Sequence, residues 1–189
     1  NLRNVPDFPI PGIQFKDVST LFKSAECLQI IVEELYNIYK DKGITKVVGI
    51  ESRGFVIGAA LALKLGAGFI MCRKPGKLPA DTLKESYMKE YGEDTIEIHS
   101  DAIDEKDIVL LHDDLLATGG SMKAAYNLVQ KFAPQKTYIN FIIERDFPMI
   151  EHFFQRIFKF FNTCSLFCGY LNHWVTYPHF QRIFVDNCG

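Results

Sequence analysis

The residues with the clearest chemical potential lie together near the middle of the chain. Asp113 and Asp114 follow the apolar run 108–111, which predicts a buried parallel strand. A turn of small residues comes next and leads into 121–132, where apolar residues recur at helical spacing. The residues of that turn are Ala117, Thr118, Gly119, Gly120 and Ser121. Two carboxylates and a flexible turn are therefore expected where a strand ends and a helix begins, which is where open α/β sheets bind ligands.

The small-residue turn is typical of a phosphate-binding site. Two glycines let an anion approach backbone N–H groups closely, and the start of the following helix adds partial positive charge. Thr118 and Ser121 can donate hydroxyl hydrogen bonds. The turn has neither the lysine of a Walker A loop nor the third glycine of a dinucleotide fingerprint. Adjacent carboxylates that accept hydrogen bonds from ribose hydroxyls favour a sugar phosphate, and an acidic turn before an ordinary helix cap is the alternative.

The elements that must position these residues alternate along the chain. The hydrophobic pattern predicts helices over 24–42, capped by Ser24, and over 54–65. Buried strands are expected at 45–50, 68–73, 108–112 and 137–143. Strand, helix and strand in repetition predict an α/β fold with a mostly parallel sheet and helices on both faces. An exposed antiparallel strand at 95–100 is expected to pair with 86–91 through a turn at 92–94.

Composition bounds the class of protein. At 189 residues, with 48% hydrophobic and 23% charged residues, the chain reads as a globular domain with a sizeable core. A net charge of −2 argues against a general nucleic-acid binder. No apolar run is long enough to span a membrane, so no membrane association is expected. Five cysteines without a paired framework fit a reducing compartment, and we expect a cytoplasmic protein.

The strand, the two acids and the Thr-Gly-Gly turn resemble the signature of the type I phosphoribosyltransferases. Four other stretches, in family order and with similar spacing, narrow the resemblance to the adenine phosphoribosyltransferases: 6–18, 49–55, 73–79 and 87–92. The resemblance runs from about residue 3 to about residue 145. It implies the type I fold, with a mobile hood hairpin over a parallel sheet flanked by helices.

The resemblance also implies an activity in purine salvage. The family transfers the phosphoribosyl group of 5-phosphoribosyl pyrophosphate (PRPP) to adenine, giving AMP and pyrophosphate. Mg²⁺ is expected as cofactor, held mainly through PRPP oxygens rather than by protein ligands. A homodimer is implied by the resemblance alone.

The family pattern assigns the phosphate-binding residues. The 5′-phosphate is expected on 117–121, with the ribose hydroxyls near Asp113 and Asp114. Pyrophosphate is expected on two loops that contain Glu51, Ser52, Arg53, Arg73, Lys74 and Lys77. The peptide bond between Glu51 and Ser52 tends to be cis in the family. The alternatives are a surface Glu–Arg pair for the first loop and a solvated basic hairpin for the second.

Other residues are expected to act on the base. Glu90 matches the hood glutamate, here a hypothetical general acid or base for the purine N7 proton, and Arg53 joins it as a catalytic candidate. Tyr91 matches the hood tyrosine that closes over the substrates. Phe15 matches the aromatic that stacks on adenine, while backbone groups at Gln14 and Lys16 read its edge. Core packing is the alternative for Phe15, and Lys16 stands where arginine is frequent.

Two features depart from the family. His112 stands where a β-branched apolar residue usually precedes the acids, and we expect it to be neutral and packed.

Aromatic residues and three of the five cysteines gather in 147–189. We interpret 1–170 as the phosphoribosyltransferase domain, with its amino terminus truncated, and 171–189 as an aromatic-rich tail. Residues 163–167 are the candidate for the final strand of the fold. A zinc site in this region is the alternative, but the spacing of its cysteines and histidine matches no strong zinc-binding pattern.

Two other functions remain open. One is a non-catalytic PRPP-sensing regulator, which is disfavoured by the retained hood sequence and the absence of a basic recognition helix. The other is a phosphoribosyltransferase for another base, and the stretches 73–79 and 90–92 favour adenine over it.

Overall fold

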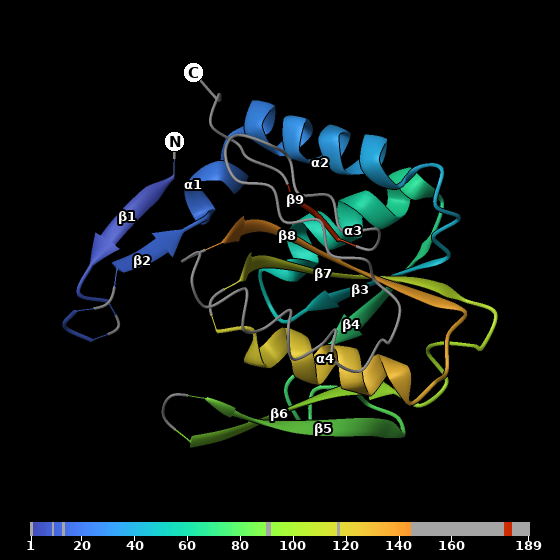
Figure 1. Ribbon diagram of the computed structural model, residues 1–189. Coiled ribbons are helices and arrows are strands. Elements are labelled where there is room, and N and C mark those ends of the chain that lie inside the picture. Colours follow the sequence, from blue (N-terminus) through green and yellow to red (C-terminus); the bar gives the residue numbers. More distant parts are fainter. Residues whose placement is uncertain are drawn as a thin grey trace, which may run out of the picture.

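The computed structural model describes residues 2–8, 10–12, 14–89, 92–116, 118–144 and 180–182. Its strands are β1 (Arg3–Pro6), β2 (Gln14–Asp17), β3 (Lys46–Ile50), β4 (Gly68–Cys72), β5 (Thr82–Lys89), β6 (Gly92–His99), β7 (Ile108–Leu116), β8 (Lys136–Glu144) and β9 (Phe180–Arg182). Its helices are α1 (Ser19–Phe22), α2 (Ala25–Tyr39), α3 (Gly54–Leu65) and α4 (Gly120–Gln130) (Figure 1).

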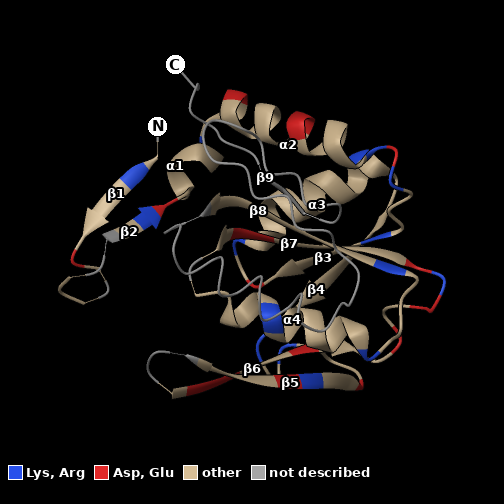
Figure 2. Cartoon of the chain, viewed as in Figure 1, with Lys and Arg blue, Asp and Glu red and all other residues tan. Residues whose placement is uncertain are grey.

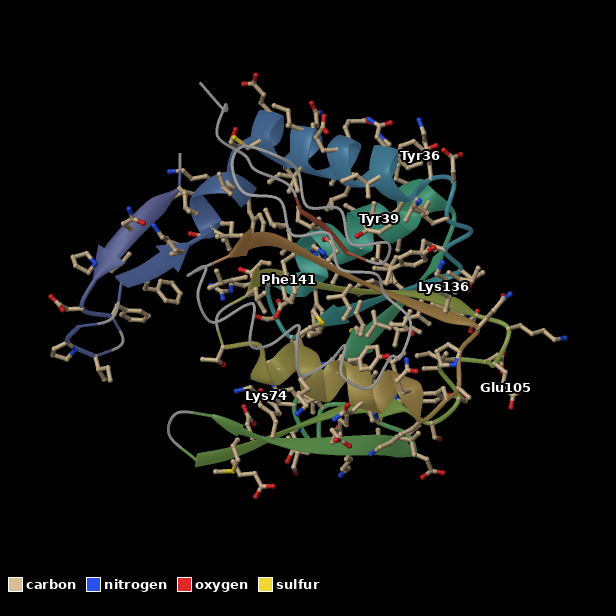
Figure 3. All side chains as sticks on the ribbon, viewed as in Figure 1. Tyr36, Tyr39, Lys74, Glu105, Lys136 and Phe141 are labelled. Carbon is tan, nitrogen blue, oxygen red and sulfur yellow. The ribbon has the colours of Figure 1, made fainter. Side chains whose placement is uncertain are left out.

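A parallel sheet in the order β4-β3-β7-β8-β9 forms the centre of the molecule. Helices α2 and α3 cover one face and α4 covers the other (Figure 1). Side chains alternate across the strands, so Val47 and Leu110 pack with α2 and α3, whereas Val48 and Leu111 pack with α4. Side chains fill both layers (Figure 3). The predicted α/β fold is confirmed.

Local signals set several element ends as expected. Ser24 caps α2 by accepting a hydrogen bond from the backbone N–H of Cys27 at 3.3 Å. Helix α3 ends at Gly66, whose φ of 68° suits glycine. At the other end of α3, a Cβ on Gly54 would lie 2.8 Å from the His112 carbonyl oxygen. Glycine therefore lets the start of α3 approach β7 closely.

The structure corrects several expected boundaries, two of them near the acids and the hairpin turn. Strand β7 continues to Leu116, so both acids lie within the strand rather than in a turn after it. In the β5–β6 hairpin, Lys89 pairs with Gly92, which places 92–94 in a strand and not in the turn. The ladder of backbone hydrogen bonds persists at both places, and a hydrophobic pattern alone does not mark where such a ladder stops.

The expectation that the second strand of this hairpin is exposed is wrong. Ile96 and Ile98 are buried in the core that α4 covers, and Glu97 between them is buried as well. The hairpin packs along α4, where the Nζ atom of Lys131 lies 2.8 Å from Glu85 Oε2. The alternation of Ile96 and Ile98 with polar Glu97 suggested one solvated face, but the Glu97 side chain is buried against Gly76 and Thr82.

Most of the aromatic-rich segment lies outside the described residues, including the expected domain boundary at 170 and the candidate strand 163–167. Residues 180–182, within the segment expected to be a tail, form β9 and pair in parallel with β8. None of the described helices combines the length and apolar character that crossing a bilayer requires.

Candidate active site

An ion pair between α3 and β7 joins two of the predicted loops. Arg53 precedes α3, and its Nε atom lies 3.0 Å from Oδ2 of Asp114 in β7. The Asp114 side chain is almost fully buried, whereas that of Arg53 is 39% exposed, so the guanidinium keeps a free face. β3 and β7 are parallel neighbours, and this brings the loop after β3 to the carboxyl end of β7.

The two acids of β7 are coupled. Asp113 Oδ1 accepts a hydrogen bond of 2.9 Å from the backbone N–H of Asp114. Burial raises the pKa of Asp113 well above its usual range, and the nearby charge of Asp114 raises it further. Burial also raises the pKa of Asp114, but Arg53 opposes that shift. Asp114 is therefore the ionised partner of Arg53, and Asp113 is the carboxyl that holds a proton more readily. In Figure 2 this acid pair is the red stretch near the end of β7.

The glycine turn leads directly into α4. Gly119 takes a left-handed conformation with φ 77° at the helix N-cap, and it has no side chain with which to cap the first turn. The N–H groups at the start of α4 are therefore suited to an anion. Ser121 donates a hydrogen bond of 3.1 Å to Tyr87 Oη of the hairpin. A Cβ on Gly120 would lie 3.3 Å from the Tyr87 ring, so glycine also allows the hairpin to pack here.

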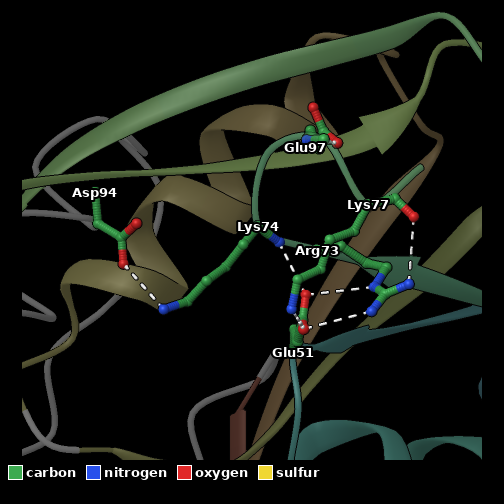
Figure 4. A network of polar contacts seen from close by, with 7 residues as sticks. Glu51, Arg73, Lys74, Lys77, Asp94 and Glu97 are labelled. Atoms are coloured by element: carbon green, nitrogen blue, oxygen red, sulfur yellow. Dashed lines mark hydrogen bonds and ion pairs between the residues drawn. The ribbon is translucent and has the colours of Figure 1, made fainter. Parts of the chain in front are cut away.

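Three basic residues after β4 surround one carboxylate (Figure 4). Glu51 Oε1 lies 2.6 Å from Lys77 Nζ, and Glu51 Oε2 lies 3.3 Å from Arg73 Nε. The backbone N–H of Lys74 donates to the same carboxylate at 3.0 Å. Lys74 extends its side chain toward Asp94, with 3.9 Å between Nζ and Oδ2. Two of the cations predicted for pyrophosphate, those of Arg73 and Lys77, are therefore gathered beside the loop that precedes α3.

The Glu51 side chain organises these cations. Burial alone would raise the pKa of Glu51, but hydrogen bonds from Lys77, the Lys74 backbone and Arg73 lower it to about 2. An ionised carboxylate repels phosphate oxygens, so the Glu51 side chain is not suited to bind phosphate directly. Glu51 does lie in the loop expected to hold pyrophosphate, but its side chain faces the cations of Arg73 and Lys77. The peptide bond between Glu51 and Ser52 is cis, as the resemblance implied.

An aromatic platform lies beside the ion pair. The Arg53 guanidinium is centred 5.5 Å from the Phe15 ring, and Phe8 meets the same ring edge-on with 5.1 Å between centroids. Phe15 belongs to neither of the two apolar cores that the described residues form, which disfavours the core-packing alternative. Its neighbour Lys16 donates from Nζ to Asn4 Oδ1 at 2.7 Å, across the β1–β2 ribbon.

The potential for metal binding rests on Asp113 and Asp114. Carboxylate oxygens are the hard donors that Mg²⁺ prefers. Over the part of the chain that the structure describes, no three His, Cys, Asp or Glu side chains gather around one position.

Comparison with known proteins identifies the family. Residues 17–145 match the phosphoribosyl transferase domain family. The adenine phosphoribosyltransferase of Phocaeicola vulgatus is 70% identical over 144 residues, which are 76% of this chain and 83% of the relative. The chain belongs to the adenine phosphoribosyltransferases. The enzyme of Saccharomyces cerevisiae, solved with an imino-altritol bisphosphate and adenine, is 40% identical with a TM-score of 0.72 over 77% of this chain and 85% of that one.

A second solved member of the family supports the same assignment. The Giardia lamblia enzyme in complex with 9-deazaadenine is 44% identical, with a TM-score of 0.73 over 76% of this chain and 81% of that one. The family assignment and the type I fold predicted from the sequence are thus confirmed.

The structure brings together most of the residues that the adenine phosphoribosyltransferase pattern singled out. Those found around the Arg53–Asp114 pair, the glycine turn and the cation loop are Phe15, Glu51, Ser52, Arg73, Lys74, Lys77, Asp113, Thr118, Gly119, Gly120 and Ser121. Ala117, Glu90 and Tyr91 lie outside the described residues, as does the side chain of Gln14. Their roles stay predictions.

Sequence reasoning missed three polar residues. Glu97 and Tyr87 come from strand positions whose partners are far away in sequence, so no local signal marks them. Asn140 lies on β8, where its Oδ1 is 2.7 Å from His112 Nδ1. Burial lowers the pKa of His112 to about 4, which keeps the ring neutral at physiological pH. This agrees with the expectation of a packed, neutral histidine.

Proposed function

We propose that this chain catalyses the family reaction with the residues described above, transferring the phosphoribosyl group of PRPP to adenine and releasing pyrophosphate. The observation that carries the proposal is the Arg53–Asp114 ion pair. It joins the loop expected to hold pyrophosphate to the strand expected to hold the ribose, with Phe15 against the same guanidinium. Three substrate groups can therefore meet at one edge of the sheet.

PRPP would lie along this edge. Its 5′-phosphate fits the turn 118–121 at the start of α4, where helix N–H groups favour an anion. Its ribose hydroxyls fit beside Asp113 and Asp114, since carboxyl oxygens accept hydroxyl hydrogen bonds. The pyrophosphate fits beside Arg53 and the cations of 73–77, which Glu51 gathers.

The reaction exchanges two bonds at the anomeric carbon. The bond from C1′ to the pyrophosphate oxygen breaks, the bond from C1′ to adenine N9 forms, and adenine loses one proton. Arg53, Arg73 and Lys77 stabilise the negative charge that develops on the leaving group. Phe15 stacks on the base and aligns it for attack. We assign the proton of adenine to Glu90, on the family pattern.

Mg²⁺ would enter with PRPP and neutralise part of the pyrophosphate charge when bound. Asp114 is committed to Arg53, which leaves Asp113 as the carboxyl available to the ribose hydroxyls. Asp113 can accept from a ribose hydroxyl when ionised and donate to it when protonated.

The direct test is conversion of radiolabelled adenine to AMP with PRPP and Mg²⁺. We expect turnover that excess unlabelled hypoxanthine and guanine do not suppress. PRPP binding without turnover would contradict the proposal and favour the sensing role, and competition by hypoxanthine would redirect it to another purine. Arg53→Ala, which leaves Asp114 buried without its cation, provides the inactive control.

We also extend the family's homodimer and cytoplasmic location to this chain. Exposed apolar side chains on α3 and β4, those of Val56, Leu63 and Met71, are available for such pairing. Sedimentation equilibrium of the full chain should give twice the chain mass, and a monomer at micromolar concentration would contradict the pairing.

A further inference from the structure

We propose that Glu97 is a positioning residue that holds the pyrophosphate loop, defined as 73–77, in its binding conformation. The inference rests on the proposed function, because it assigns a role within the same site. Glu97 lies in β6, outside every stretch that the sequence pattern assigned to substrate.

The first link between Glu97 and the loop is through the backbone. The N–H of Arg73 donates to the Glu97 carbonyl at 2.9 Å, and the N–H of Glu97 donates to the Arg73 carbonyl at 2.7 Å. This reciprocal bridge fixes the point at which the loop leaves β4. The Arg73 side chain then begins from a fixed backbone position.

The second link is through the side chain. Glu97 Oε1 accepts a hydrogen bond of 2.9 Å from the backbone N–H of Gly76, at the turn of the loop where φ is 78°. Glu97 Oε2 accepts from the Thr82 hydroxyl at 3.2 Å and lies 3.4 Å from Lys84 Nζ. The residue is only 1% exposed, so each of these donors compensates for lost hydration. Figure 4 shows Glu97 beside the loop, across from Glu51.

The negative charge of Glu97 is balanced by Lys84 and not by the cationic side chains of the loop. Burial would raise its pKa, but Lys84, the Gly76 N–H and Thr82 hold that pKa below its usual range, so the carboxylate is ionised. Lys84 lies on β5, outside the loop, and its pairing leaves the positive field of the loop available to phosphate. Glu51 contacts the cationic side chains, whereas Glu97 acts through the loop backbone.

Folding alone does not explain a carboxylate here. The hairpin already has a continuous cross-strand register and packs on α4, and Ile96 and Ile98 supply its core contacts. A buried ion pair is often replaceable by a well-packed apolar residue without loss of stability. A loop that is held in place before the ligand arrives loses less entropy on binding, so Glu97 should act on pyrophosphate affinity.

The test compares Glu97→Gln and Glu97→Leu with wild type in the reverse reaction, from AMP and pyrophosphate. We expect the KM for pyrophosphate to rise about tenfold in Glu97→Leu, equivalent to about 1.4 kcal/mol. The KM for AMP should change by less than about twofold, because AMP is not expected to contact the loop. Glu97→Gln keeps an amide oxygen for Gly76 and should show a smaller rise in the same constant.

Glu85→Gln is the matched control, since Glu85 is on the same hairpin and ion-paired to Lys131 but does not contact the loop. It should leave the KM for pyrophosphate unchanged. Calorimetric titration with magnesium pyrophosphate gives the same comparison without turnover. If Glu97→Leu does not fold, Thr82→Val, which removes one donor to this carboxylate, replaces it.

An unchanged KM for pyrophosphate in these variants would overturn the inference, as would a parallel rise in both KM values. A wild-type chain that binds pyrophosphate but turns over no adenine would overturn the proposed function and leave the positioning role standing. The two failures are therefore distinguishable.

Discussion

At the scale of single residues, the site depends on charges that are partly or fully removed from water. Asp114 is buried and is ion-paired to Arg53, which keeps an exposed face for substrate. Removing one member of such a pair leaves the other uncompensated, and this costs more than the pair contributes to stability. The most sensitive substitutions should therefore be those that remove charge without changing shape.

Asp114→Asn tests this directly. We expect kcat/KM for PRPP to fall at least about 100-fold, because Arg53 loses the charge that orients it and the ribose loses one acceptor. Steady-state kinetics with varied PRPP measures the effect. Asp101→Asn, an exposed aspartate outside the site, is the control and should retain wild-type kinetics. Retained activity in Asp114→Asn would contradict the role given to the pair.

At the scale of elements, the β5–β6 hairpin connects the two phosphate-binding regions. Ser121, at the start of α4, donates to Tyr87 Oη, which lies 3.4 Å from Asp94 Oδ2 on the paired strand. Asp94 in turn faces Lys74 of the pyrophosphate loop. A hairpin held by such contacts is suited to the hood role that the resemblance implied, because a few hydrogen bonds determine how firmly it docks.

Tyr87→Phe should loosen this docking. Loss of the hydroxyl removes two hydrogen-bonding contacts, and we expect the unfolding free energy to fall by about 1–2 kcal/mol. Amide hydrogen exchange over 82–89 should accelerate more than exchange in β3. Tyr36→Phe, on the opposite side of the sheet, is the control and should leave exchange in the hairpin unchanged. Equal protection of the hairpin in Tyr87→Phe and wild type would show that packing on α4 alone holds it.

At the scale of the whole molecule, the central sheet separates two cores, and a polar pair lies within the buried layers. His112 and Asn140 are both fully buried and are bonded to each other. A histidine with a folded pKa of about 4 must charge in the unfolded chain at a higher pH, near 6.5. The unfolded state therefore binds more protons in this interval, and stability rises with pH.

The pH dependence of unfolding tests the buried histidine. We expect the wild-type free energy of unfolding to decline as pH falls from about 6.5 to about 4, by up to about 3 kcal/mol attributable to His112. Urea denaturation of wild type and His112→Leu across this range isolates the contribution, because other titrating groups act on both. His112→Leu is less stable near neutral pH, since Asn140 loses its partner, but its curve should be flatter. Parallel curves would contradict the assignment.

Local patterning was sufficient for much of the architecture and for the glycine turn. Alternating strands and amphipathic helices, a serine cap and a small-residue turn are read within a few neighbouring residues. The extent of β7, the turn of the hairpin and the burial of Glu97 were not predictable in this way. Each depends on where a hydrogen-bonded ladder or a packing surface ends in space.

By itself, the sequence of this chain determined the order of strands and helices from α2 to β8 and the presence of acids followed by a glycine turn, because those features depend on residues that are close neighbours. The tertiary structure alone decided which distant charges meet. Parallel pairing of β3 with β7 brings Arg53 to Asp114, and folding of the hairpin onto α4 brings Glu97 behind Gly76. Contacts of this kind form only when separate elements are packed, since the free energy that fixes them comes from burial of the whole sheet.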